Sequence, residues 1–181
     1  MLREAGDTVG SIALFDDEYR RTPSLTSYRR LLDEADLLGE RAKFRTKALE
    51  QLRRTVATQP STGRARPSDV LIEILFDGEI DDAWVVASEH GCDERLWLTL
   101  AATRQQDHPL DTIPIYERAA LAAINTKNNK GYAIAVDHLG RVRQLAERTG
   151  EPSLFVGLIA EIRTKHKPKR NLMALLDRNR W

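Results

Sequence analysis

The sequence is poor in the features that mark secreted and membrane proteins. Its 181 residues include one cysteine, so no disulfide can form within the chain, which suits a reducing compartment. No apolar run approaches the roughly 20 residues that a membrane-spanning helix needs. The first ten residues, MLREAGDTVG, contain acids and lack the apolar core of a signal peptide. We therefore expect a cytoplasmic protein without a membrane segment.

Catalytic and metal-binding motifs are equally scarce. The segment HGCDERLWLTLA offers only His90 and Cys92 as ligands, whereas a zinc site uses three or four. No particular base is placed to activate Cys92 as a nucleophile. The remaining histidines are scattered, and no glycine-rich phosphate loop is present. We expect no catalytic residue, no metal and no cofactor, so the chain is not expected to be an enzyme.

The same segment has a structural interpretation, as the joint between two helices. Gly91 suits the turn after a helix, and the Asp93 side chain can accept a hydrogen bond from the next helix's first turn. Trp84 and Trp97 fall on the apolar faces of the two helices, so both rings are expected to be largely buried. We predict a structural joint made of Trp84, Cys92, Asp93 and Trp97.

What the chain does contain is helical periodicity. Hydrophobic residues make up 41% and charged residues 30%, which is typical of a globular protein. Apolar residues recur at spacings of three and four, as in Tyr28, Leu31 and Leu32, and predict roughly nine or ten helices. We trust no strand. The fold class is predicted to be all-α.

Two blocks of the sequence resemble one another. Three positions match at a separation of 69 residues, Ser24, Tyr28 and Leu31 with Asp93, Trp97 and Leu100. Helix pairs that repeat in this way can stack into an α-solenoid, each burying a face on its neighbours. We predict a tetratricopeptide-like stack of helix pairs, with an irregular helical bundle as the alternative.

One segment cannot bury a helix face. ATQPSTGRARPSD, residues 57–69, is rich in Pro, Ser, Thr, Gly and Arg and has no large apolar residue. It predicts an N-terminal helical group at 1–57, a surface linker at 58–68, and a helical-repeat region with a basic end at 69–181.

Charge is distributed unevenly along the chain. Residues 58–111 contain 4 basic and 11 acidic residues, whereas residues 112–181 contain 13 and 6. The basic excess is densest in RTKHKPKRN, which could contact phosphates by charge alone. It has no interleaved aromatic residues for base stacking. The candidate anion or nucleic-acid contacts are Arg163, Lys165, Lys167, Lys169 and Arg170.

Residues 83–177 resemble a known family. Five segments are similar to the C-terminal helical region of bacterial, mostly actinobacterial, SWIM zinc-finger proteins: AWVVASEHGC, RLWLTLAATR, HPLDTIPIYERAA, YAIAVDHLGRVRQLAERTG and IRTKHKPKRNLMALLD. The resemblance implies a helical-repeat region without assigned catalytic residues. It implies no zinc finger here, because the family motif of Cys-x-Cys followed by Cys-x-His needs more than one cysteine.

Two functions follow as predictions. The first is a non-catalytic helical-repeat module that serves as a scaffold for binding a protein partner. The alternative is sequence-independent nucleic-acid binding through the basic C-terminal third.

Overall fold

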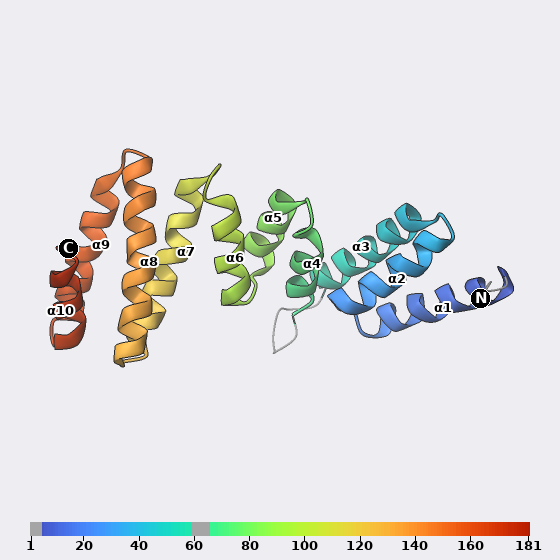
Figure 1. Ribbon diagram of the computed structural model, residues 1–181, viewed down its shortest axis with the longest axis horizontal. Coiled ribbons are helices and arrows are strands. Elements are labelled where there is room, and N and C mark those ends of the chain that lie inside the picture. The colour runs from blue at the N-terminus through green and yellow to red at the C-terminus, as the bar shows by residue number, and fades with distance from the viewer. Residues whose placement is uncertain (1–4, 59–65) are drawn as a thin grey trace. The chain divides into compact units, whose positions relative to one another are not determined.

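A computed structural model describes residues 5–58 and 66–181. Within these ranges the chain forms ten α-helices and no strand (Figure 1). The all-α prediction is confirmed, as is the expected number of helices. The segment GYAIAVDHLGRV, whose apolar residues also alternate like those of a strand, lies within helix α8 (Asn129–Arg148). Residues 59–65 of the predicted linker lie outside the described residues.

The helices form two compact units, residues 1–96 and 97–181. The division falls inside α6 (Glu94–Arg104), and the predicted linker at residues 58–68 stays a prediction. The helices on either side of that segment, α3 and α4, pack against each other within the first unit. A stretch without apolar residues identifies a connection that cannot be buried, but it does not determine which helices pack together.

In the first unit each helix packs against the next along the chain, and α2 also contacts α4. Its fully buried side chains include Leu31, Leu52 and Leu75. The Tyr19 hydroxyl, also buried, donates a hydrogen bond to the Ala48 carbonyl oxygen at 3.3 Å and so links α1 to α3. The helices are α1 (Ala5–Arg21), α2 (Leu25–Leu37), α3 (Arg41–Thr58), α4 (Pro67–Leu75) and α5 (Ile80–His90).

Some acidic residues of the first unit form ion pairs with basic residues of another helix. Arg45 on α3 pairs with Glu79 just before α5, and Arg53 pairs with Asp82 at 3.2 Å. These carboxylates therefore already face cations of their own unit.

The second unit is organised around α8. Three helices pack against it: α7 (Pro109–Asn125), α9 (Pro152–Lys165) and α10 (Arg170–Arg178). The face of α8 that they cover includes Ala135, Leu139 and Ala146, all fully buried. All three neighbouring helices contact α8. The positions of the two ends of α8 therefore determine where the turns that connect these helices lie.

The predicted helix ends are mostly observed. Ser24 caps α2 in a reciprocal pair with Ser27, and Gly91 takes a positive φ where α5 ends. Pro152 occupies the first turn of α9, where its missing N–H costs little. Pro114 lies inside α7, which begins at Pro109 and continues through it.

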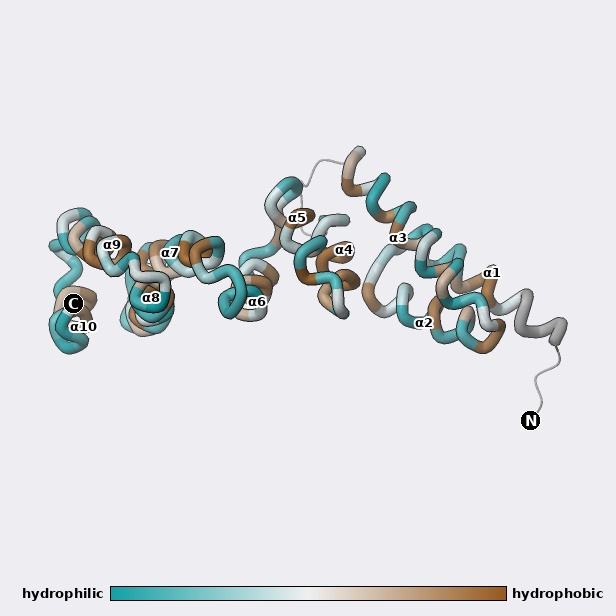
Figure 2. The backbone as a smooth tube through the Cα atoms, turned by 90° about the horizontal axis from the view of Figure 1, so that it is seen from above, coloured by the Kyte–Doolittle hydropathy of each residue, from teal (hydrophilic) through white to brown (hydrophobic). Residues whose placement is uncertain are grey.

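Hydrophobic residues are spread over all the helices. Figure 2 shows short hydrophobic stretches recurring between hydrophilic ones along the helices. Among the described residues, no helix is both long enough and apolar enough to span a bilayer.

The position of Leu139 generates a stability prediction. Leu139→Ala should lower the free energy of unfolding by about 2–5 kcal/mol, because the side chain is fully buried on the helix that organises the second unit. Urea denaturation followed by circular dichroism measures the loss. Ile134→Ala is the matched control on the same helix; its side chain is 41% exposed, so it should cost less than about 1 kcal/mol. Equal losses would contradict the assigned core face.

Candidate functional site

The segment that contains His90 and Cys92 is a helix joint in the structure. His90 is the last residue of α5, Gly91 ends the helix, and Cys92 is 6% exposed. The Asp93 carboxylate accepts a hydrogen bond from the Arg95 backbone N–H at 2.8 Å, which is the predicted cap of α6. The Asp93 backbone N–H in turn donates to Asp69 Oδ1 at 2.9 Å. Each of these contacts holds the turn in place.

The two tryptophans of the joint are neither fully buried nor freely exposed. Trp84 and Trp97 were expected to be largely buried, and both have intermediate exposure. The Trp97 ring has the Arg118 guanidinium carbon 5.4 Å from its centroid, a cation–π arrangement that suits a partly exposed ring. The helical stripe shows which face of a helix points inward, whereas the depth of burial depends on neighbouring helices that periodicity cannot identify.

The described residues contain no group of three or more His, Cys, Asp and Glu side chains that could hold a metal ion.

The five basic residues predicted as anion contacts do not all face the same way. Arg163 pairs with Asp177 at 2.6 Å and donates to the Trp181 carbonyl oxygen at 3.1 Å, so it holds the last turn of the described chain. Lys165 lies near Glu161 one helical turn away. Lys167 and Arg170 are exposed beside the break at Pro168, where α9 ends and α10 begins. Arg163 therefore has a structural role, and the other four remain candidates.

The structure adds two lysines from a distant part of the sequence. The turn between α7 and α8 lies at the same end of the second unit as the turn between α9 and α10 (Figure 1). Lys169 Nζ donates to the Ile124 carbonyl oxygen at 3.3 Å, and Asn171 Nδ2 donates to Asn129 Oδ1 at 2.8 Å. These bonds join the two turns. The resulting basic turn cluster consists of Lys127, Lys130, Lys165, Lys167, Lys169 and Arg170.

Negative charge is nearly absent from this cluster. The sequence has no Asp or Glu between Glu117 and Asp137, or between Glu161 and Asp177. Neither α8 nor α10 has an acidic residue in its first turn. The positive dipole ends of α8 and α10 lie in these turns together with the negative ends of α7 and α9, so the positive charge of the cluster comes from its side chains.

The crowding of positive charge affects two titratable groups. Partial burial, followed by the charge of Lys127, lowers the pKa of Lys169 below its usual value. Partial burial also lowers the pKa of His166, and the charges of Lys169 and Lys165 add to this effect. The charges of the two turns therefore act on one another.

The turn that presents Lys127 depends on a glycine. The Asn128 side chain caps α8 by accepting from the Gly131 N–H at 2.8 Å. A Cβ on Gly131 would lie 2.5 Å from the Ala123 carbonyl oxygen and would also collide with Thr126 Oγ1. Since Ala123 and Thr126 belong to the end of α7, glycine is needed for α8 to begin this close to it.

Sequence reasoning missed Lys127 and Lys130. Both lie in NTKNNKGYA, a segment that contains no glycine-rich phosphate loop. The available signal was the run of residues 118–136, which contains basic residues and no acid. Such a run does not reveal that its turn lies beside another turn about 40 residues later in the chain.

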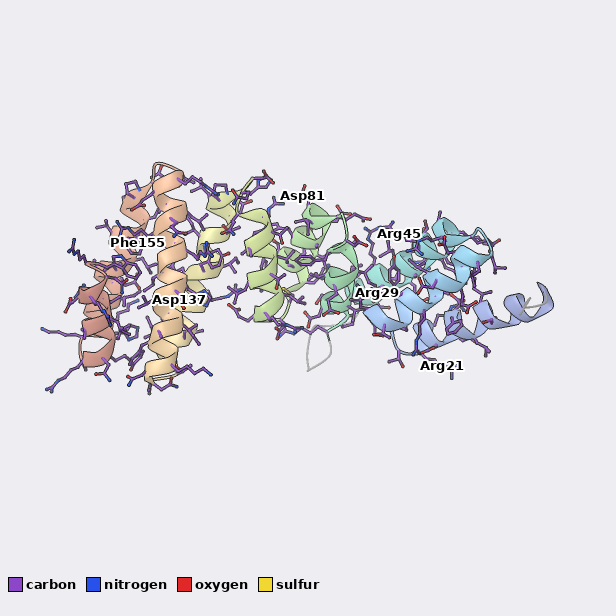
Figure 3. All side chains as sticks on the ribbon, in the orientation of Figure 1. Arg21, Arg29, Arg45, Asp81, Asp137 and Phe155 are labelled. Carbon is purple, nitrogen blue, oxygen red and sulfur yellow. The ribbon has the colours of Figure 1, made fainter. Side chains whose placement is uncertain are left out.

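An apolar groove lies toward the other end of the same helices. It measures about 310 Å³ and is lined by α9 side chains, Trp181 and residues from the second half of α8. Phe155, labelled in Figure 3, packs edge-on against the Trp181 ring at 5.3 Å. Val156 is 66% exposed beside it. The groove is separate from the basic turn cluster. The two lie along different parts of α8, and a helix lengthens by about 1.5 Å with each residue.

No protein-family model, curated protein or solved structure matches this chain. The resemblance to SWIM zinc-finger proteins stays a prediction.

The Gly131 contact yields a paired prediction. Gly131→Ala should destabilise the protein by about 1–3 kcal/mol, because the added methyl group overlaps backbone that cannot easily move. Gly140→Ala, on the same helix, should instead stabilise it by about 0.5–1 kcal/mol, because the nearest atom to the new Cβ is 3.9 Å away. Thermal unfolding of both variants checks the signs. A neutral Gly131→Ala would show that the turn does not need this close approach.

His166 yields a prediction about pH. Its pKa is lowered in the folded protein, so the unfolded chain takes up this proton first as the pH falls below about 6.5. The contribution of His166 to stability is present above that pH and is lost as the pH falls toward the folded-state pKa. His166→Gln should therefore lose less stability between pH 7.5 and pH 5 than the parent protein, as measured by urea denaturation. An equal loss of stability in His166→Gln and in the parent protein would contradict the lowered pKa of His166.

Proposed function

We propose that this chain is a non-catalytic interaction module, and that the basic turn cluster of its second unit binds an anionic macromolecule. The observation that carries the proposal is the convergence of two turns, distant in sequence, that bring six cations together without a carboxylate in either turn. Arranging like charges in this way costs free energy in the free protein. An anion placed against the cluster offsets that cost.

The pairing of carboxylates in the first unit supports the same proposal. Where acids gather there, as at Glu79 and Asp82, cations from α3 neutralise them within the unit. The basic turn cluster has only the exposed pair of Lys165 with Glu161. Exposed pairs of this kind contribute little, so the cluster keeps its charge available for a partner.

The fold proposal goes further than an all-helical chain. We propose that successive helices, such as α1 with α2 and α4 with α5, are pairs of a tetratricopeptide-like stack. The resemblance to the helical region of SWIM zinc-finger proteins suggests the same role, a helical module beside a nucleic-acid or protein recognition domain. In such a module, binding uses an exposed surface and no reactive centre.

Retention on two anionic matrices, heparin and immobilised polyglutamate, tests the proposed function. The full chain should be retained at 50 mM salt and released as salt rises, because exposed charges are screened. The triple variant Lys165→Gln, Lys167→Gln and Arg170→Gln should elute at clearly lower salt. Lys169 is left unchanged because it joins the two turns through Ile124.

A matched triple variant controls for net charge. Arg141→Gln, Arg143→Gln and Arg178→Gln remove the same charge from exposed positions of the second unit outside the two turns. This variant should elute close to the parent. Equal shifts for both triples would show that net charge alone causes retention, and flow-through on both matrices would refute the proposed function.

A further inference from the structure

We infer that the anionic macromolecule is a nucleic acid, held through its phosphodiester backbone without reading of the bases. This inference rests on the proposed function, since it identifies the partner of the same basic turn cluster. The competing partner is an acidic protein surface. Three features of the cluster distinguish the two.

The first feature is the absence of apolar anchors. The exposed large hydrophobic side chains of the described residues lie elsewhere, and none comes from residues 125–131 or 163–171. Protein–protein interfaces depend on a core of buried apolar and aromatic anchors. Interfaces with nucleic acid are more polar and more positively charged. A surface of lysines and asparagines therefore matches the second kind.

The second feature is the type of charge. Five of the six cations are lysines, which act as mobile point charges and do not require one fixed geometry. Phosphates along a backbone present similar charges at regular intervals, so a flexible set of ammonium groups can engage them whatever the sequence. The exposed amide nitrogen of Asn129 adds a neutral donor of the kind that also contacts backbone phosphates, whereas the Asn128 amide is used within the turn, where it caps α8 and donates to the Thr126 carbonyl oxygen.

The third feature is that the cluster has no exposed aromatic ring on which a base could stack. No aromatic residue occurs in the two turns, and Tyr132, the nearest in sequence, is buried. Base stacking needs an exposed ring, and recognition of base edges usually involves a rigid bidentate side chain. The cluster contains one arginine, Arg170, beside the helix break. Affinity without sequence preference is the expected consequence.

The roles within the cluster differ. Lys169 is partly buried and bonded to the Ile124 carbonyl oxygen, so it positions the α9–α10 turn against the α7–α8 turn. Lys127, Lys130, Lys165, Lys167 and Arg170 are exposed and supply the phosphate contacts. Figure 3 shows nitrogen-tipped side chains extending from this end of the unit. The α7–α8 turn supplies Lys127 and Lys130, which the basic segment alone would not provide.

Fluorescence anisotropy with the full chain tests the inference. The probes are two 20-base-pair DNA duplexes of unrelated sequence, an RNA duplex of the same length, and labelled polyglutamate. The two DNA duplexes should bind with affinities within about twofold of each other. The logarithm of the binding constant should fall with the logarithm of salt concentration, with a slope no steeper than about −5, because at most six phosphates are neutralised.

The decisive variant is Lys127→Gln with Lys130→Gln. Loss of two phosphate contacts should reduce the slope by about 2 and weaken duplex binding roughly 50-fold at 0.1 M salt. The control is Arg143→Gln with Arg178→Gln, which removes the same charge outside the two turns and should change affinity less than about threefold. Circular dichroism establishes that both variants are folded.

The possible outcomes separate this inference from the proposed function. Binding of either duplex more tightly than polyglutamate, with the expected loss in the lysine variant, supports the inference and shows whether DNA or RNA is preferred. Polyglutamate binding as tight as duplex binding refutes the inference and leaves the proposed function intact. A preference of more than about 100-fold between the two DNA sequences also refutes it, because backbone contacts cannot discriminate sequence. No binding to any probe refutes both.

Discussion

The close approach of α8 to the end of α7 at Gly131 is the constraint on which the second unit depends. Because that position has no Cβ, α8 can begin beside the Ala123 carbonyl and the Thr126 side chain. From there α8 provides the surface against which α7, α9 and α10 pack. The turn before α8 is thereby fixed next to the turn before α10, and the bonds from Lys169 and Asn171 connect them.

This packing brings lysines from two turns together, so that their charges act jointly. A single exposed lysine interacts weakly with an anion in water, because solvent and salt screen it. Several lysines on two adjoining turns raise the local potential and attract a polyanion more strongly than each would separately. Partial burial, and after it the charge of Lys127 on the other turn, lowers the pKa of Lys169. The proposed binding therefore depends on helix packing rather than on one special residue.

The two units handle charge in different ways, and the difference follows from their packing. In the first unit α3 presents cations such as Arg45 and Arg53 toward the acids near α5, so opposite charges meet across helices. In the second unit the turns that meet are both basic, and Arg163 is used to hold the last turn through Asp177. The acidic part of the sequence is thus paired with cations of its own unit, whereas the basic part is brought next to another basic turn.

The sequence by itself determined the features that depend on neighbouring residues. Periodic apolar residues, Ser24 and Asp93 as caps, and Gly91 as a helix end were sufficient to predict an all-α chain and its joints, because each acts within one or two helical turns. Only the tertiary structure decided what depends on distant residues: the partial burial of Trp84 and Trp97, the division within α6, and the addition of Lys127 and Lys130 to the basic segment. The spacing of residues along one helix carries no information about which other helix will lie beside it.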